Sequence, residues 1–353
     1  MKKLRVLIVG SAFAADLHAD AYSRIGEKVQ IVGISGRDLD RVHALAERYG
    51  FTDYKAYDDY DQAIAECDCD LVDICLPNFL HHEVTIKALN RGRDVICEKP
   101  MATTVEDAQD MVDTAARLDK RIYYAEDWLF APAFRKAMEI LESGKVGRPL
   151  YVRARECHSG SHSPYAQKIE YCGGGSMIHL GVHPVCFLLA MKNNEWAELV
   201  AMTSGGKEDN LVHHGMEGED WAGAFIRFKD GTFATLEANY VTVGGMEDMM
   251  DIYCEEGCIH VDLSFSGPIR AFSIPGLDYT VEKAEVTTGW STPAVDEKQN
   301  LGYCGEIEHF VDCALKGIDA EVGLRGIDGL ETMKVINLIY KSAREGISIR
   351  NES

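Results

Sequence analysis

A glutamate and a lysine stand at the end of a short apolar run and are followed at once by a proline. Residues 95–97 are apolar or small, which is typical of a parallel strand buried on both faces, and Pro100 ends that strand. Lys99 is thereby held at the carboxyl end of the strand, where open α/β sheets bind their ligands. An ammonium group there can stabilise a developing negative charge. Glu98 beside it predicts either an orienting partner or an ordinary surface ion pair.

Two histidines follow a run of three glycines further along the chain. The glycines 173–175 predict a helix start whose exposed amides approach a ligand, and His179 and His183 lie four residues apart, hence on one face of that helix. A histidine suits the removal of a proton from a hydroxyl group at neutral pH. The same spacing also suits two zinc ligands, with Cys157 and His158 as further candidates, or two structural histidines without a ligand.

The composition is that of a folded chain with two domains. At 353 residues, the chain is longer than a single hydrophobic core usually supports. Its 46% hydrophobic and 26% charged residues are typical of globular proteins. The net charge of −21 opposes binding to nucleic acid and to anionic membrane surfaces. No apolar run approaches the roughly 18 residues that span a bilayer, and no signal peptide is indicated. The eleven cysteines lack zinc-type spacing, so we expect a cytoplasmic protein with reduced thiols.

The start of the chain has the pattern of a dinucleotide-binding turn. A buried strand over residues 4–9 runs into Gly10, Ala12 and Phe13 at the start of a helix. In the usual glycine-rich pattern, backbone amides at this helix start approach a pyrophosphate. Ala12 stands where the second glycine belongs, so this motif alone is weak.

A second strand, over residues 29–34, ends in Ser35 and Arg37. An acidic residue at this edge would hold the ribose of NAD, whereas Ser35 and Arg37 suit a 2′-phosphate or an arginine stacked on adenine, which leaves both NAD and NADP open. Strands and helices continue to alternate, which predicts right-handed crossovers and a doubly wound parallel sheet. The expected segments are helices 39–49, 60–66, 82–91 and 105–118, and strands 71–75, 95–98 and 122–125.

Several motifs together resemble the glucose–fructose oxidoreductase/inositol dehydrogenase (Gfo/Idh/MocA) family. The resemblance covers nearly the whole chain and rests on Leu76-Pro77-Asn78 with His81, Glu98-Lys99-Pro100, Phe130-Ala131-Pro132, the glycine-rich segments 144–147 and 173–183, and the closing residues 342–346. It implies an α/β protein with an N-terminal Rossmann domain, 1–125, and a C-terminal α+β domain, 126–353. The second domain has an open, mainly antiparallel sheet that serves as a homo-oligomer interface, and C-terminal helices that pack back on the first domain. An Asp-Gly turn within residues 225–234 independently predicts a hairpin of that sheet.

The resemblance further implies an NAD- or NADP-dependent oxidoreductase that works without a metal. In this reading His183 is the base, Lys99 stabilises the alkoxide, Glu98 orients Lys99, and His179 completes the catalytic set. The hydride goes to the nicotinamide, whose chemistry belongs to the cofactor. The residues expected to contact the cofactor are Gly10, Ala12, Phe13, Ser35, Arg37, Leu76, Pro77, Asn78, His81, Glu98 and Lys99.

Two departures from the family pattern bear on the substrate. His179 stands where the family most often has aspartate, and Glu126-Asp127-Trp128 stands where a basic residue is common. Trp128 predicts a stacking wall for a sugar or an aglycone. With Lys99, His179 and His183, the expected substrate contacts include His158 and Tyr165 in the segment 158–171, for which simple surface is the alternative.

We therefore expect oxidation of a secondary hydroxyl of a sugar, cyclitol or glycoside, with C3 oxidation of a glucoside to its 3-keto form as the specific version. Two alternatives stay open. One is a glycosidase that oxidises its substrate transiently with NAD, and the other is a non-catalytic regulator that senses NAD(P).

Overall fold

The computed structural model describes residues 3–161, 163–264, 271–276, 288–291 and 295–351, and the chain divides into two compact units. Unit 1 contains Met1–Phe130 and Gly302–Met333, and unit 2 contains Ala131–Leu301 and Lys334–Ser353. This division differs from the expected single boundary after residue 125. The physical reason is that helix α11 (Tyr303–Lys316) packs against helix α1 (Phe13–Arg24) within unit 1.

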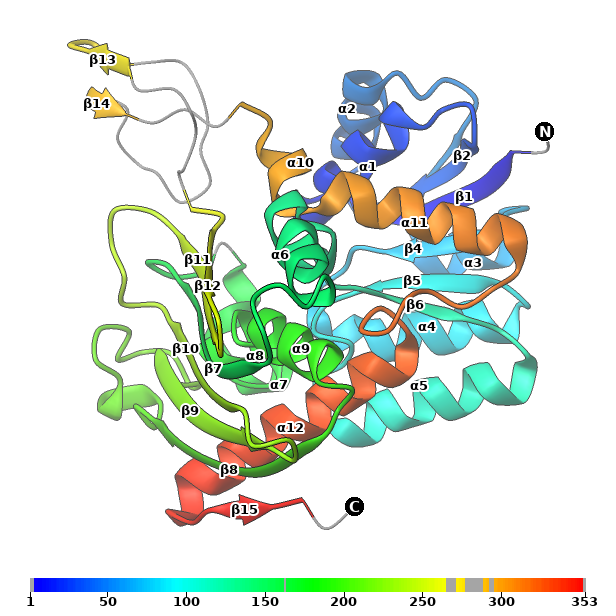
Figure 1. Cartoon of the computed structure of the whole chain (residues 1–353). Coiled ribbons are helices and arrows are strands. Elements are labelled where there is room, and N and C mark those ends of the chain that lie inside the picture. Colours follow the sequence, from blue (N-terminus) through cyan, green and yellow to red (C-terminus); the bar gives the residue numbers. More distant parts are fainter. Residues whose placement is uncertain (1–2, 162, 265–270, 277–287, 292–294, 352–353) are drawn as a thin grey trace. The chain divides into compact units, whose positions relative to one another are not determined.

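Unit 1 is built on a six-stranded parallel sheet with the order β3-β2-β1-β4-β5-β6, which confirms the predicted Rossmann topology (Figure 1). Right-handed crossovers in this order place α1 and α2 on one face and α3, α4 and α5 on the other. The strands are β1 (Leu4–Val9), β2 (Val29–Ser35), β3 (Lys55–Tyr57), β4 (Leu71–Ile74), β5 (Asp94–Glu98) and β6 (Ile122–Ala125). The other helices are α2 (Leu39–Tyr49), α3 (Tyr60–Glu66), η1 (Asn78–Leu80), α4 (His81–Asn90), α5 (Val105–Leu118) and η2 (Asp127–Phe130).

Unit 2 is built on a seven-stranded sheet with the order β12-β11-β7-β10-β9-β8-β15. All its pairs are antiparallel except β7 with β10, so the predicted, mainly antiparallel sheet is confirmed. The predicted hairpin joins β9 to β10 through Asp230 and Gly231. The strands are β7 (Pro149–Cys157), β8 (Trp196–Thr203), β9 (Trp221–Phe228), β10 (Phe233–Asn239), β11 (Glu247–Cys254), β12 (Cys258–Asp262) and β15 (Ile349–Arg350).

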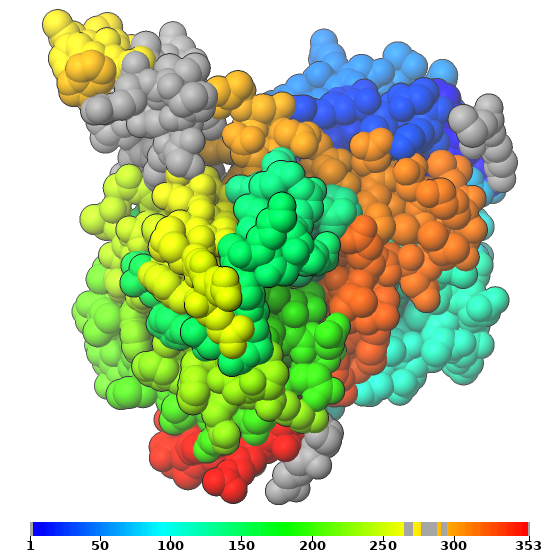
Figure 2. Space-filling view, viewed as in Figure 1, coloured from blue at the N-terminus to red at the C-terminus, as the bar shows by residue number. Residues whose placement is uncertain are grey.

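Helices cover part of this sheet. Helix α6 (Pro132–Glu142) lies beside β12, and the two are neighbours on the surface shown in Figure 2. The remaining elements are η3 (Pro164–Gln167), α7 (Ile169–Cys172), α8 (Ser176–His179), α9 (Val182–Met191), η4 (Lys207–Asp209), α10 (Glu297–Leu301) and the strand pair β13 (Ala271–Ser273) and β14 (Gly289–Ser291). Helix α12 (Gly326–Glu345) begins in unit 1 and ends in unit 2.

The prediction that His179 and His183 share one helix is wrong. His179 ends α8 and His183 lies in the first turn of α9, with a bend of 56° between the helical segments. Pro184 explains the break, because its ring nitrogen cannot donate to the carbonyl of Leu180 and a continuous helix would need that bond.

Among the residues with described positions, no single helix is long and apolar enough to cross a bilayer. The bent pair Ile169–His179 and Val182–Met191 meets the criteria for a membrane span by length and composition alone. Its second part, α9, is almost wholly buried, as a core helix of a globular unit is.

Candidate active site

The turn after β1 fits a bound dinucleotide. Gly10 has a φ of +132°, and a Cβ added there would lie 2.2 Å from the carbonyl oxygen of Cys75. The cap residue of α1, Ala12, makes no side-chain hydrogen bond to the amides of the first turn. Phe13, the first residue of the helix, is 51% exposed. A close backbone turn before uncapped helix amides is the arrangement that a pyrophosphate requires.

The end of β2 lies beside this turn. The amide of Gly10 donates to the carbonyl of Ser35 over 2.8 Å, and a Cβ on Gly36 would lie 2.4 Å from Oγ of Ser11. The Ser35 side chain is buried, whereas Arg37 is exposed. The structure thus brings these predicted cofactor residues to one edge of the sheet.

His81 is enclosed by protein. It is fully buried, with Nδ1 2.8 Å from the carbonyl oxygen of Pro100 and Nε2 2.7 Å from that of Leu76. Burial lowers the pKa of this imidazole. His81 therefore ties the Leu76-Pro77-Asn78 turn after β4 to Pro100, the residue that follows Lys99. Its predicted contact with the cofactor stays a prediction.

Lys99 follows a strand that is fixed on both sides. β5 pairs with β4 and β6, and Glu98 stands opposite Ala125. Oε2 of Glu98 accepts a hydrogen bond from the backbone amide of Lys99 at 2.9 Å, and Oε1 lies 3.0 Å from Nε2 of His18. The other ring nitrogen of His18 lies 2.9 Å from a carboxylate oxygen of Asp73 in β4. These contacts fix the Glu98 carboxylate beside the half-buried Lys99.

The charges of this network support one another. Burial would lower the pKa of His18, but the charge of Asp73 and its hydrogen bond to His18 raise that pKa well above the ordinary value. Burial would raise the pKa of Glu98, but the hydrogen bond and charge of His18, with the charge of Lys99, lower it. Glu98 is therefore an anion whose carboxylate is held at the backbone amide of Lys99, and its role in orienting the Lys99 ammonium stays a prediction.

Glu126, the residue after β6, carries a buried carboxyl group whose pKa is raised, in contrast to that of Glu98. Glu126 is fully buried, and burial raises its pKa to about 8 although the charge of Lys99 opposes this shift. Its amide donates to the buried carboxyl of Glu306, whose pKa burial raises well above the ordinary value. Trp128 is 1% exposed. This side chain is therefore enclosed by protein, and its predicted role as a stacking wall for a sugar or an aglycone stays a prediction.

In unit 2, the prediction that the triple-glycine amides approach a ligand is wrong. The amides of Gly175 and Met177 donate to the carboxyl of Glu219 at 3.1 and 2.8 Å, and the amide of Ile178 donates to Oη of Tyr340 at 3.2 Å. A Cβ on Gly174 would lie 2.4 Å from that hydroxyl oxygen. The glycines therefore allow close packing against Glu219 and Tyr340, and burial raises the pKa of Glu219 to about 7.

His183 lies against a carboxylate that the sequence reading missed. Its Nε2 is 3.8 Å from Oε2 of Glu156 in β7, and both side chains are buried. A carboxylate at this distance stabilises the imidazolium that forms when a histidine takes up a proton. This geometry suits a general base.

His179 contacts a second missed residue, Tyr240. Nδ1 of His179 lies 2.7 Å from Oη of Tyr240, and the ring of His158 stacks on Tyr240 with 5.3 Å between centroids. His158 Nδ1 accepts from the amide of Gly160, and Cys157 Sγ accepts from Asn239. Among the residues that the structure describes, the groups close enough to share a metal ion do not include the set of His179, His183, Cys157 and His158, and the metal-free site stays a prediction.

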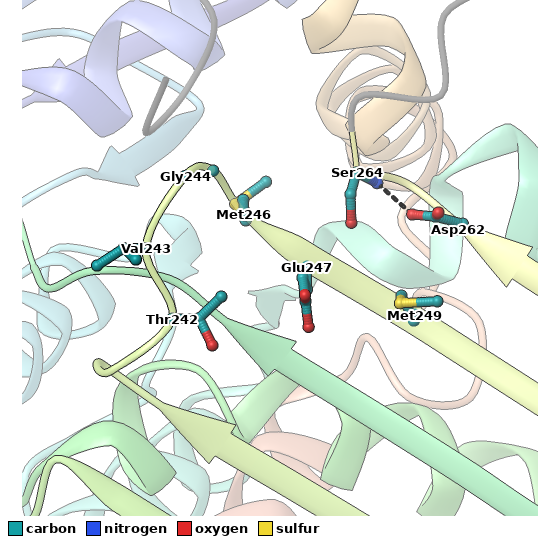
Figure 3. A pocket seen from close by; sticks show the side chains of 9 residues that line it. Thr242, Val243, Gly244, Met246, Glu247, Met249, Asp262 and Ser264 are labelled. Atoms are coloured by element: carbon teal, nitrogen blue, oxygen red, sulfur yellow. Dashed lines mark hydrogen bonds between the residues drawn. The ribbon is translucent and has the colours of Figure 1, made fainter. Parts of the chain in front are cut away.

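The other features of unit 2 lie apart from these contacts. Tyr165 is partly buried and meets Tyr171 edge to face at 5.9 Å. A cavity of about 360 Å³ opens at the loop after β10, with the side chains of Glu247, Met249 and Asp262 around it (Figure 3). Its lining contains none of the predicted substrate residues.

Alternation along the strands was the signal that could have found both missed residues. In β7, Glu156 has the same parity as the buried Val152 and Ala154. Tyr240 continues the buried row of Leu236 and Ala238 in β10. Successive side chains of a strand point to opposite faces, so a glutamate in an inward row requires a partner.

Known proteins share both units. Residues 4–126 match the model of an oxidoreductase family with an NAD-binding Rossmann fold, and residues 134–260 match the GFO/IDH/MocA C-terminal domain. A D-glucoside 3-dehydrogenase of Escherichia coli K12 is 28% identical over 98% of this chain and 97% of its own.

Solved structures agree in fold. GenD2 from gentamicin A biosynthesis, in complex with NAD, has a TM-score of 0.90 at 22% identity, covering 100% of this chain and 97% of that one. Myo-inositol 2-dehydrogenase from Lactobacillus plantarum has a TM-score of 0.81 at 18% identity, covering 99% and 100%. The protein is thus a member of the Gfo/Idh/MocA family of NAD-binding oxidoreductases.

Proposed function

We propose that the protein oxidises a secondary hydroxyl of a sugar, cyclitol or glycoside, with C3 of a glucoside as the specific position. The observation that carries the proposal is the fixed pair of Glu98 and Lys99 at the carboxyl end of β5. Support for the position comes from the similarity, along 98% of the chain, to a D-glucoside 3-dehydrogenase.

The proposed roles follow from the local contacts. The turn at Gly10 and the end of β2 would hold NAD, which would supply the hydride acceptor when bound. His183 takes the proton of the substrate hydroxyl, and Glu156 stabilises the resulting imidazolium. The Lys99 ammonium, held beside the Glu98 carboxylate, stabilises the developing alkoxide. His179 binds a further oxygen of the substrate.

Product analysis tests this function. Incubation with NAD or NADP and methyl β-D-glucopyranoside should produce reduced cofactor and one ketone, and reduction of that product with borodeuteride should place deuterium at C3. Deuterium at another carbon would refute the C3 assignment only. Release of an aglycone from an aryl glucoside without net cofactor reduction would favour transient oxidation. Cofactor binding without turnover of any polyol would favour a sensing role.

We also propose that the protein forms a homo-oligomer through the outer face of the seven-stranded sheet. Large apolar side chains on this face are exposed, with Met202 72%, Phe225 63% and Phe233 53% accessible. Val200 stands opposite Phe225, and Tyr151 stands opposite both Phe233 and Tyr253. An apolar patch that runs across several strands is typical of a self-association surface.

Light scattering of Phe225→Lys tests the interface. The variant should lower the oligomer mass, whereas Phe272→Lys, an exposed residue of β13, should not. An unchanged mass for Phe225→Lys would refute the proposed face.

A cytoplasmic location accords with the burial of ten of the eleven cysteines.

A further inference from the structure

Two cysteines of unit 1 stand on a tight turn between α3 and β4 (Figure 1). The amide of Cys69 donates to the carbonyl oxygen of Cys67 at 3.1 Å, which closes a three-residue γ-turn around Asp68. This turn brings the Cα atoms of the two cysteines closer than an extended chain does, toward the roughly 4.4–6.8 Å that a disulfide spans. Both thiols are free and buried, whereas the side chain of Asp68 is 80% exposed. The dithiol turn, defined as residues 67–69, therefore lies directly beneath the surface.

Neighbouring strands hold the dithiol turn in place. Arg5 in β1 forms ion pairs with Asp68 inside the turn and with Asp70 directly after it. Gly33 in β2 leaves the space that the sulfur of Cys67 occupies, because a Cβ at Gly33 would lie only 2.9 Å from that Sγ. The position of the turn is therefore set by the sheet.

Arg93 places a positive charge beside the two thiols. It directly precedes β5, and its guanidinium donates to the carbonyl oxygen of Cys67 at 3.4 Å. A hydrogen bond from the Cys69 thiol lowers the pKa of Cys67, and burial opposes this shift. The Tyr57 hydroxyl and the charge of Arg93 lower the same pKa further. The bond between the thiols and burial raise the pKa of Cys69, so Cys67 ionises first and Cys69 keeps its proton.

We propose that Cys67 and Cys69 form a peroxide-reactive dithiol, which a hydroperoxide oxidises to a disulfide and a thiol reductant reopens. A stabilised thiolate beside a second thiol is the arrangement that this chemistry requires. The turn precedes β4, whereas Lys99 follows β5, so the pair lies at the opposite edge of this parallel sheet from Lys99. The reactivity is therefore independent of the proposed dehydrogenase function.

The oxidation balances in two steps. The Cys67 thiolate attacks one oxygen of hydrogen peroxide, the O–O bond breaks, and the departing hydroxide takes up the proton that Cys67 released and leaves as water. The sulfur of Cys69 then attacks the resulting sulfenic acid, the S–S bond forms, and the sulfenic hydroxyl leaves with the Cys69 proton as a second water. The two thiols lose two electrons, and the peroxide gains them. A bridge between residues so close in sequence closes a small, strained ring, so a dithiol reductant should restore the pair readily.

Mass spectrometry of the full chain tests the bridge. The reduced protein is treated with hydrogen peroxide, its remaining thiols are blocked with N-ethylmaleimide, and the unfolded chain is cleaved in front of its aspartates. This cleavage separates Cys67, Cys69 and Cys75 into different peptides. We expect the peptide 61–67 to be joined to the dipeptide 68–69 until dithiothreitol releases it. Absence of this bridge, or a sulfinic acid on Cys67 in its place, would overturn the proposal.

Serine variants test the order of the two steps. Cys69→Ser removes the second thiol, so oxidation should stop at a sulfenic acid on Cys67, which dimedone traps. Cys258→Ser, which removes an exposed thiol, is the matched control and should form the bridge at the wild-type rate. If Cys67→Ser gave a dimedone adduct on Cys69 as fast as Cys69→Ser gives one on Cys67, the assignment of Cys67 as the attacking thiol would be overturned. The wild-type measurement needs no substitution, so a variant that fails to fold leaves the test of the bridge intact.

The charge of Arg93 is tested by the pH dependence of bridge formation. Because the thiolate is the nucleophile, the rate should rise with pH through the pKa of Cys67. Arg93→Met should slow the reaction severalfold at neutral pH and move this rise to higher pH, whereas Arg93→Lys keeps the charge and should stay close to the wild type. Arg91→Met, at an exposed neighbouring position, is the control. An unchanged pH profile in Arg93→Met would overturn the role of the charge.

Discussion

Nε2 of His18 lies 3.0 Å from Oε1 of Glu98, and this contact joins the first helix of the Rossmann unit to the residue that precedes Lys99. The residue pair is buried, and Asp73 holds the other side of the imidazole. The position of Glu98, the neighbour of Lys99, therefore depends on His18, which is 80 residues away in the sequence.

Replacement of His18 should weaken both the fold and the reaction. His18→Gln removes the positive charge between the buried carboxylates of Asp73 and Glu98. We therefore expect the free energy of unfolding to fall by about 3 kcal/mol and kcat to fall roughly tenfold. Chemical denaturation and steady-state kinetics measure the two effects. His43→Gln, on the exposed side of α2, is the control and should change neither. Wild-type values in His18→Gln would contradict the positioning role.

Replacement of Glu156 should affect the base. Glu156→Gln keeps the shape of the side chain but removes the charge 3.8 Å from His183, so the imidazolium loses stabilisation. We expect kcat to fall about tenfold with little change in KM. Glu139→Gln, on the exposed face of α6, is the matched control. A change in KM alone would show that Glu156 serves binding rather than proton transfer.

Glu126 should make stability depend on pH. Its pKa is raised to about 8 in the fold, so folding takes up a proton between the ordinary carboxyl value and pH 8, and the stability contribution present at low pH is lost as pH rises. Glu126→Gln mimics the protonated form. The variant should therefore gain stability over the wild type as pH rises from 5 to 8, on the order of 1 kcal/mol per pH unit at most. Denaturation at several pH values measures the difference, and a constant difference would contradict the raised pKa.

The glycine loop before α8 should tolerate no side chain. A Cβ on Gly175 would lie 2.0 Å from the carbonyl oxygen of Glu219, whereas a Cβ on Gly215 meets nothing within 4 Å. Gly175→Ala should lower the free energy of unfolding by about 3 kcal/mol or more, and Gly215→Ala by less than about 1 kcal/mol. Similar denaturation midpoints for the two variants would show that the loop relaxes around the methyl group.

Much of the fold could be predicted because its signals are local. The strands of unit 1 are short apolar runs, and the Asp230-Gly231 turn marks the hairpin of unit 2. The partners of the site residues could not be predicted in this way. Tyr340 reaches Gly175 across 165 residues and Tyr240 reaches His179 across 61, so only the tertiary fold brings them together. Pro184 was a local signal for the break between His179 and His183.

The most direct test of the central claim compares the wild type with Lys99→Met in the reduction of NAD and NADP. The reduction is measured by the absorbance of the reduced nicotinamide. The substrates are a panel of free sugars, inositols and glucosides. The wild type and the control Lys136→Met, an exposed lysine of α6, should reduce cofactor with one substrate class. Lys99→Met should lose about a hundredfold in kcat while still binding the cofactor. Full turnover by Lys99→Met would contradict the account.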